Sequence, residues 1–303
     1  MKSLISVTVV LLLLSAAASP AKAGSDMPAV TSENKIPQER GATPSPLHHD
    51  RHGVRQSRTT ALRRVTDGMH TPRKPQLALA VFRVAPPSEY RPMETLKEIV
   101  IDVIVAFTGK AANSYSDIRR ELIDHAIEVA NESFRVSNLG HIRLNLAHAY
   151  ATDYIEEGSH FDHLWRFADK GDGYMEEVHS LRDRYRADVA VLIVHDPRGC
   201  GLATRVRADA DEAFAVVHHE CAAANYTLAH EIGHLIGATH DLSYVNGTKW
   251  RDIMGVKERC GGCPRLPVWS SPTVLVDDEP AGTADHDNAR VIAEQAGRVA
   301  AFR

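Results

Sequence analysis

The stretch Tyr226–Asp241, YTLAHEIGHLIGATHD, contains the pattern H-E-x-x-H-x-x-G-x-x-H. On a helix, His230 and His234 lie one above the other on the same face, because they are four residues apart. Two imidazole nitrogens in this arrangement can bind one Zn²⁺, and Glu231 beside them can take a proton from water. The rest of the chain is therefore interpreted as the structure that surrounds this helix.

The same stretch supplies a third metal ligand. Gly237 lets the chain leave the helix through a left-handed turn at little steric cost, and this turn allows His240 to swing back towards the first two histidines. Three protein ligands with one open position are typical of a catalytic zinc site, whereas structural zinc sites are closed by four ligands. A lone His on an apolar helix is usually a core residue, but five fixed positions match by chance at only about one in a few million start points.

The composition is that of a soluble globular protein with one sizeable core, since the chain has 303 residues, 44% hydrophobic and 24% charged. Residues 1–23 form a separate segment, with basic Lys2, the apolar run Leu4–Leu14 and the small-residue sequence Ala21-Lys22-Ala23. This arrangement is typical of a secretory signal peptide, so we expect the mature chain to be secreted, either extracellular or periplasmic. No other long apolar run is present, so no association with a membrane is expected.

Residues 24–93 differ in charge from the rest of the chain. They contain 11 Lys and Arg against 6 Asp and Glu, whereas residues 94–303 contain 22 against 33. Their weak apolar periodicity predicts a largely disordered pro-region or linker, and their positive charge predicts that they dock on the acidic domain as its inhibitor. The acidic balance of residues 94–303 argues against nucleic acid as a partner. The sequence does not set the oligomeric state, and a monomer is assumed.

Residues 94–303 alternate between strand and helix patterns and are interpreted as one catalytic domain. Strands are predicted at residues 99–107, 141–150, 188–194, 200–207 and 213–217, and helices at 116–140, at 173–185 and from 285 onwards. The runs 99–107 and 188–194 are continuously apolar and rich in β-branched residues, as expected for strands buried on both faces. This order predicts an α/β (α+β) fold with helices packed on a mixed sheet.

Four cysteines, Cys200, Cys221, Cys260 and Cys263, allow three disulfide connectivities. In an exported chain, disulfides are favoured over a metal or redox site. No second C-x-x-C pair is present to complete a four-cysteine zinc site. We predict the pairs Cys200–Cys221 and Cys260–Cys263, of which the first would hold the strand region before the zinc helix and the second would close a short loop.

Other clusters of polar residues are interpreted as structural. His48–His52 is a solvated polar run without regular ligand spacing, and His218 and His219 lack the i, i+4 pairing of a helical metal site. The acidic residues between Asp169 and Glu177 do not match the spacing of an EF-hand loop. Ca²⁺ is therefore not indicated, and helix capping explains these residues better.

The zinc motif, together with Met254 in Asp252-Ile-Met-Gly255 and the motifs of the C-terminal tail, resembles the metzincin metallopeptidases. Within that group the chain is most similar to the bacterial peptidyl-Asp metalloendopeptidases, which are related to the reprolysins. The resemblance covers Glu94–Arg303. Besides the zinc motif, it is carried by residues 173–179, 252–255, 263–267, 271–272 and 282–291.

The resemblance implies a zinc-dependent endopeptidase that hydrolyses proteins on the N-terminal side of Asp. It also implies a twisted mixed sheet above the zinc helix and a small C-terminal subdomain below it, in which Met254 forms a Met-turn under the histidines. Two features depart from the pattern. Val256 stands where some metzincins carry Tyr, so no tyrosine ligand or oxyanion partner is indicated, and residues 24–93 contain no Cys, which excludes latency through a pro-region cysteine.

Two other functions fit the same motif. Three histidines and a Glu would also serve a zinc hydrolase of small molecules, but an open cleft beside an exposed edge strand would favour the peptidase over this alternative. The second alternative is a non-catalytic exported module that only binds zinc. Such a module does not need a base at Glu231, which counts against it.

An Asp-selective site needs a local cation, because a buried carboxylate without a partner is unfavourable. In metzincins the segment after the Met-turn forms the outer wall of the pocket beyond the scissile bond, and here it contains Lys257, Arg259 and Arg265. We predict that Arg265 binds the Asp side chain, because the Cys263-Pro264 corner restrains it and a guanidinium can hold a carboxylate through two parallel bonds. Lys257 is the second candidate, and the alternative is that all three are solvated loop charges.

Overall fold

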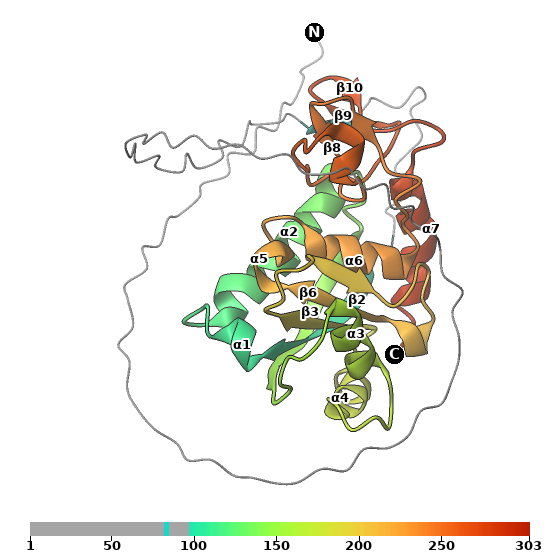
Figure 1. Ribbon diagram of the computed structural model, residues 1–303. Coiled ribbons are helices and arrows are strands. Elements are labelled where there is room, and N and C mark those ends of the chain that lie inside the picture. The colour runs from blue at the N-terminus through green and yellow to red at the C-terminus, as the bar shows by residue number, and fades with distance from the viewer. Residues whose placement is uncertain (1–81, 85–96) are drawn as a thin grey trace, which may run out of the picture. The chain divides into compact units, whose positions relative to one another are not determined.

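Five strands form the central sheet in the part of the chain that the computed structural model describes, residues 82–84 and 97–303 (Figure 1). In spatial order they are β3 (Ile142–Thr152), β2 (Ile99–Thr108), β4 (Val189–Val194), β6 (Phe214–His218) and β5 (Gly201–Ala203). Strands β3, β2, β4 and β6 run parallel, and β5 pairs antiparallel with β6 at one edge. The sheet is therefore mixed, as the sequence predicts.

Helices cover both faces of the sheet, because its central strands are apolar on both sides. The longer helices are α2 (Asp124–Val136), α3 (His160–Ala168), α4 (Glu177–Tyr185), α6 (Thr227–Ile236) and α7 (Asn288–Val299). In β2, Val105 faces the core shared with α2, α6 and α7, whereas its neighbour Ile104 faces the core shared with α3 and α4. The zinc-motif helix α6 thus packs on the same face of the sheet as α2 (Figure 1).

Short elements connect these layers. They are α1 (Gly109–Ala112), the π-type turn η1 (Arg119–Ile123), η2 (Ala210–Glu212) and α5 (His219–Ala222). The helix predicted over residues 116–140 is therefore η1 followed directly by α2. It ends at Val136, and Asn138 takes up a left-handed conformation with φ of +61°, which allows the chain to turn into β3.

The helix predicted over residues 173–185 begins later than expected. Gly171 and Gly173 adopt φ values of +80° and +87°, so the chain is not helical there. The Glu176 carboxylate accepts the amides of both glycines at 2.7 and 3.0 Å, and α4 starts directly after it. At least one of the acidic residues in this region therefore organises a turn, in line with the capping interpretation.

Helix α3 was not predicted from the sequence. Ser159 and Asp162 form a capping box at its N-terminus, with the Asp162 carboxylate accepting the Ser159 amide at 2.6 Å. Its amphipathic pattern is obscured by Phe161 and Trp165, two large hydrophobic side chains that stay 62% and 37% exposed. The capping box was the signal that could have located this helix.

A second, smaller sheet contains β1 (Phe82–Val84), β9 (Val274–Val276) and β10 (Glu279–Pro280) in the order β1-β9-β10. Strands β7 (Val245–Asn246) and β8 (Trp250–Arg251) form a hairpin, and η3 (Lys257–Cys260) follows them. Strand β1 belongs to the segment predicted as the pro-region. The predicted signal peptide, the His48–His52 run and the rest of the predicted pro-region lie outside the described residues.

All four cysteines form disulfides in the predicted pairs, Cys200–Cys221 and Cys260–Cys263. The first joins the start of β5 to α5, which precedes the zinc helix, and the second closes the loop at the end of η3. Both predicted connectivities are confirmed. In the described part of the chain, no helix is both long enough and apolar enough to cross a lipid bilayer.

Candidate active site

Three histidine side chains meet beside α6. His230, His234 and His240 are the one group of three or more His, Cys, Asp or Glu residues in the described part of the chain whose ligand atoms lie within 4.8 Å of one another. Helix α6 carries the first two, and the third follows Gly237, which leaves the helix with φ of +141°. His240 Nε2 lies 3.1 Å from His230 Nε2 and 3.2 Å from His234 Nε2.

The hydrogen bonds of two of these rings fix which nitrogen faces the centre of the group. His230 Nδ1 donates to the Ile253 carbonyl at 2.7 Å, and His234 Nδ1 donates to the Ala238 carbonyl at 3.0 Å. A neutral imidazole protonated on Nδ1 presents a lone pair on Nε2, so lone pairs converge here and repel unless a cation binds between them. Nitrogens about 2.0–2.1 Å from a tetrahedral zinc ion would be roughly 3.3 Å apart. The donor atoms and their spacing therefore fit zinc.

Burial keeps the three rings neutral. It lowers the pKa of His234 to about 4, and it is the main cause that lowers the pKa of His230 well below its usual value, with a further contribution from the neighbouring His234. Burial is also the main reason that the pKa of His240 is lowered. A metal binds the neutral imidazole, so protons do not compete with it at neutral pH.

Glu231 lies between the histidine group and the edge strand β5. The residue is only 5% exposed, and burial raises the pKa of its carboxyl group to about 8. The Ala203 amide hydrogen-bonds to this carboxylate. A Cβ atom at Gly201 would stand 2.7 Å from Glu231 Oε1, so only glycine allows the strand to approach the carboxylate this closely. A cation bound by the histidines would lower the pKa of Glu231 again.

A cavity of about 230 Å³ lies in front of these groups. It is lined by Glu231 and the three histidines on one side, and by Gly201–Ala203, Arg205 and Val206 on the other. Because β5 is the last strand of the sheet, one of its backbone edges has no strand partner. An extended peptide can pair with such an edge as an additional strand.

The segment around Met254 packs under the zinc helix. Met254 is fully buried in the core that also contains Trp269 and much of α6. A Cβ atom at Gly233 of α6 would be 2.5 Å from the Trp269 ring and 3.5 Å from Met254 Sδ, so glycine at this position permits close packing. The carbonyl that orients His230 belongs to Ile253, which directly precedes Met254. This segment therefore orients the His230 ring through the Ile253 carbonyl.

The family assignment rests on the segment that contains this site. A family model for metallo-peptidase family M12 matches residues 97–263, which include the entire zinc motif and Met254. The chain belongs to metallo-peptidase family M12.

Curated relatives share this segment. A peptidyl-Asp metalloendopeptidase of Xanthomonas campestris pv. campestris is 38% identical over 218 residues, which cover 67% of this chain and 52% of that protein. A peptidyl-Asp metalloendopeptidase of Stenotrophomonas maltophilia is 36% identical over 221 residues, again covering 67% of this chain and 52% of that protein. The chain therefore spans about half the length of these relatives.

One solved structure contains a chain with a fold similar to that of this chain. One chain in a solved structure of a chaperone-substrate complex superposes on this M12 chain with a TM-score of 0.57 at 18% sequence identity. The match covers 69% of this chain and 36% of that chain. At this level of identity the likeness concerns the fold alone.

The two predicted substrate-binding residues of this M12 metallopeptidase have different surroundings. Arg265 donates through Nη1 to the Asn225 carbonyl at 2.9 Å and through Nη2 to the Gly255 carbonyl at 3.3 Å. Its positive charge acts on the group of three histidines, since it is among the causes that lower the pKa values of His230 and His240. Lys257 is exposed on η3. The structure thus brings Arg265 close to the zinc-binding histidines.

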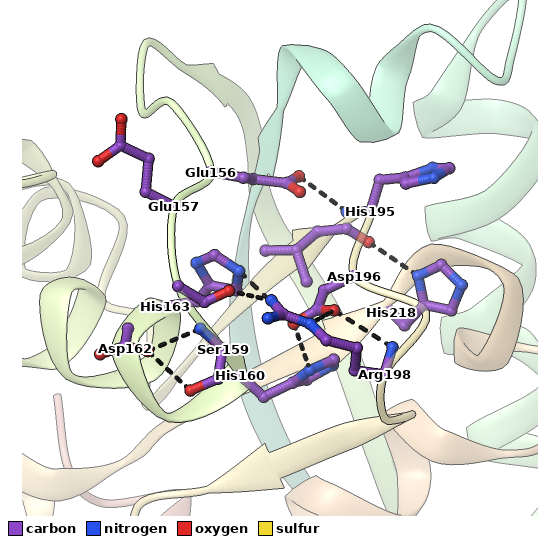
Figure 2. Close-up of polar contacts among 12 residues, drawn as sticks. Glu156, Glu157, Ser159, His160, Asp162, His163, His195, Asp196, Arg198 and His218 are labelled. Carbon is purple, nitrogen blue, oxygen red and sulfur yellow. Dashed lines mark hydrogen bonds and ion pairs between the residues drawn. The ribbon is translucent and has the colours of Figure 1, made fainter.

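A second cavity of about 220 Å³ lies at the carboxyl ends of the parallel strands, near the residues drawn in Figure 2. Its two buried carboxylates already have protein partners. Asp196 accepts Arg198 Nε at 2.6 Å and pairs with His160 Nδ1 at 2.9 Å, and Glu156 accepts the His195 amide at 2.8 Å. This network therefore holds the loop between β4 and β5 in place, and we assign it no ligand.

His218 and His219, which the sequence analysis set aside as metal ligands, belong to the surroundings of this network. His219 forms hydrogen bonds with the Tyr115 hydroxyl and with His195 Nδ1, both at 2.9 Å. His218 faces the Val194 carbonyl through Nδ1 at 3.4 Å and Glu220 through Nε2 at 3.5 Å. The ring nitrogens of both residues therefore interact with other protein groups.

Proposed function

We propose that this chain is a secreted zinc-dependent endopeptidase that hydrolyses proteins on the N-terminal side of Asp. The observation that carries the proposal is the placement of Glu231 between three converging histidines and the free edge of β5. A metal, a base and a strand edge that can bind an extended chain are the parts that peptide hydrolysis needs. The names of the two curated relatives support the preference for Asp.

In this mechanism His230, His234 and His240 would hold one Zn²⁺. A zinc ion bound there would supply Lewis-acid chemistry for the scissile carbonyl group and the attacking water. Strand β5 pairs with the extended substrate and places the scissile bond over Glu231. The Glu231 carboxylate takes a proton from the attacking water and passes it to the leaving amine, so one residue serves as base and then as acid.

We also assign the finer architecture that the family resemblance implies. Met254 is the Met-turn methionine, an apolar support under the histidines and not a metal ligand. The part of the chain after His240, with the hairpin β7-β8, strands β9 and β10 of the small sheet and α7, forms the C-terminal subdomain below the cleft. The buried packing of Met254 against the zinc helix supports this assignment.

For maturation we propose a signal peptide at residues 1–23, an inhibitory pro-region within 24–93 and a catalytic domain from about residue 94. The opposite charges of the last two segments support inhibition by the pro-region. Added residues 24–93 should inhibit the mature domain, and less so at high ionic strength, because salt screens the attraction. An inhibition constant that does not change with salt would reject the electrostatic part.

The alternatives fit the geometry less well. A zinc hydrolase of small molecules does not need a cavity that runs along the free edge of a strand, as this one does. A module that only binds zinc does not need a buried carboxylate in contact with that strand. The peptidase accounts for both features.

The test is a digestion of a mixed peptide library by the purified mature protein, with and without a chelator. We expect fragments that begin with Asp, formed only when zinc is present, and read by mass spectrometry. Cleavage that continues in excess chelator would reject the zinc mechanism. Hydrolysis of small esters or amides without any peptide cleavage would favour the first alternative.

A further inference from the structure

Two arginines are held next to each other on neighbouring segments of the C-terminal part. Arg251, at the end of β8, and Arg265 form a parallel β-bridge. The Arg251 amide donates to the Pro264 carbonyl and the Leu266 amide donates to the Arg251 carbonyl, both at 2.9 Å. Residues paired in this way direct their side chains to the same side of the two segments. The backbone therefore brings two positive charges together.

Both side chains pass Gly255, which directly follows Met254. Arg265 Nη2 donates to the Gly255 carbonyl at 3.3 Å, and a Cβ atom at Gly255 would be 2.7 Å from Arg251 Cβ and 3.3 Å from Arg251 Cδ. Arg251 also donates through Nη1 to the Cys263 carbonyl. The Nε atoms of both arginines are buried and have no hydrogen-bond partner. Each guanidinium therefore keeps one unsatisfied donor.

Neither arginine of this pair has an Asp or Glu oxygen within the 4.0 Å of an ion pair among the described residues. Burial, followed by the charge of Arg251, lowers the pKa of Arg265 to about 10. The carboxylates whose charges act on Arg265 are Glu231, which the proposed mechanism uses, and Asp252, whose buried Oδ1 also lacks a hydrogen-bond partner. A buried charge without a partner is unfavourable, so the pair is suited to an anion that the substrate brings.

Arg265 of the pair is bonded to the backbone just before the start of α6. Arg265 Nη1 donates to the Asn225 carbonyl, two residues before the first residue of the helix, Thr227. Thr227 is 1% exposed, and its hydroxyl has no hydrogen-bond partner. Its methyl group and the Glu231 side chain both lie against Gly201, at 2.8 and 2.7 Å from a Cβ built there. The Thr227 hydroxyl is thus an unsatisfied donor close to the Glu231 side chain, and the charge of Arg265 acts on the same carboxylate.

We infer that Arg265 and Arg251 form the binding site for the side-chain carboxylate of the Asp that follows the scissile bond. Arg265 binds the carboxylate directly, Arg251 keeps the site positive, and the buried Thr227 hydroxyl is a further donor beside Glu231. The inference rests on the proposed endopeptidase function and names residues for its selectivity. It explains how a domain that is acidic as a whole can select an acidic side chain, since the attraction is local.

The first experiment measures kcat/KM for blocked peptides that differ only in Asp, Asn or Leu after the scissile bond. We expect Arg265→Ala to lower the value for the Asp peptide about 10- to 100-fold more than for the other two, as for the loss of a charged hydrogen-bond pair. Arg251→Ala should lower it by about 3- to 10-fold in the same selective way, since it acts through charge rather than contact. Arg290→Ala, in an exposed ion pair on α7, is the matched control and should change none of the three.

The second experiment separates binding from turnover. The Asp and Asn peptides are titrated into zinc-loaded Glu231→Gln protein by calorimetry, with and without Arg265→Ala, and the melting temperature of every variant is recorded. If an alanine variant does not fold, Arg265→Lys or Arg251→Lys, which keeps the charge, replaces it in the same comparison of peptides. Equal losses for Asp, Asn and Leu peptides in variants that fold and carry one zinc would overturn the carboxylate site while the peptidase function stands. Failure of the wild-type protein to cleave any peptide would overturn the proposed function itself.

Discussion

Two groups of buried or half-buried histidines in the described part of the chain have similarly spaced rings. In the zinc motif, the ring centroids of His230, His234 and His240 are 4.8 to 5.1 Å apart. At the carboxyl ends of β4 and β6, those of His195, His218 and His219 are 4.7 to 5.7 Å apart. The first group directs its Nε2 atoms at one point. In the second group, the ring nitrogens of His218 and His219 face a tyrosine, a carboxylate, a carbonyl or another ring.

The difference shows that unsatisfied lone pairs, and not the number of histidines, mark a metal site. In the zinc motif, backbone carbonyls take up Nδ1 of His230 and His234 and leave Nε2 free. In the other group, His219 shares both of its nitrogens with protein groups. The spacing of the residues in the sequence predicts this outcome, because the i, i+4 pair His230 and His234 puts two rings on one side of a helix, whereas the adjacent residues His218 and His219 do not share a face.

The largest effect on activity is expected from a substitution at Glu231, which removes proton transfer but leaves the three histidines of the first group in place. Glu231→Gln should keep zinc near one ion per chain but lower kcat by about 10²- to 10⁴-fold, because the base is lost while the ligands remain. His234→Ala should lose both zinc and activity. Zinc content by atomic absorption and peptide hydrolysis measure the two properties. More than about a tenth of the wild-type rate in Glu231→Gln would disprove the role of the base.

A smaller effect on activity is expected from a substitution at Gly201, where the loop between β4 and β5 enters β5. Gly201→Ala would place a Cβ atom 2.7 Å from Glu231 Oε1, so the carboxylate must move, and we expect kcat/KM to fall about tenfold or more while zinc stays bound. Gly199→Ala is the matched control, because its Cβ would be an ordinary 3.6 Å from His160. Equal rates for the two variants would show that the contact with Glu231 does not constrain catalysis.

The second group should contribute to stability and not to metal binding. Bonds from Arg198 are the main cause that holds the pKa of Asp196 well below its usual range, so this stabilisation is present above the unfolded-state pKa of about 3.9 and is lost as the pH falls further. Asp196→Asn should cost about 1–2 kcal/mol at pH 7, a modest value because Arg198 is exposed to solvent. Thermal melts at pH 7 and at pH 3 measure it. A difference that is as large in acid as at neutral pH would contradict the role of the charge.

The smallest effect, no change at all, is expected for zinc content when the second group is altered. His195→Gln removes the ring that His219 contacts but should leave one zinc per chain, because this group has no converging lone pairs. Titration of metal-free protein with zinc measures the stoichiometry. A fall from two ions in the wild-type protein to one in His195→Gln would show that the second group also binds metal.

The sequence was sufficient where one short pattern decides the structure. The zinc-motif spacing predicted the convergence of His230, His234 and His240, and the apolar runs predicted β2 and β4 to within two residues. Sequence patterns did not predict the features that depend on backbone turns or on contacts between distant residues. The start of α4 depends on two glycines with positive φ, and the proximity of Arg251 to Arg265 depends on a bridge that no periodicity reveals.

The pairing of β1 with β9 has a consequence for biosynthesis. Arg83 of β1 forms an ion pair with Asp278, a residue 195 positions further along the chain. A ribosome releases a chain from its N-terminus, so β1 must wait for almost the whole polypeptide before its partner strand emerges. Closing so long a loop is also slow in entropic terms. The small sheet is therefore expected to form late, after the central strands β2 and β4 have been synthesised.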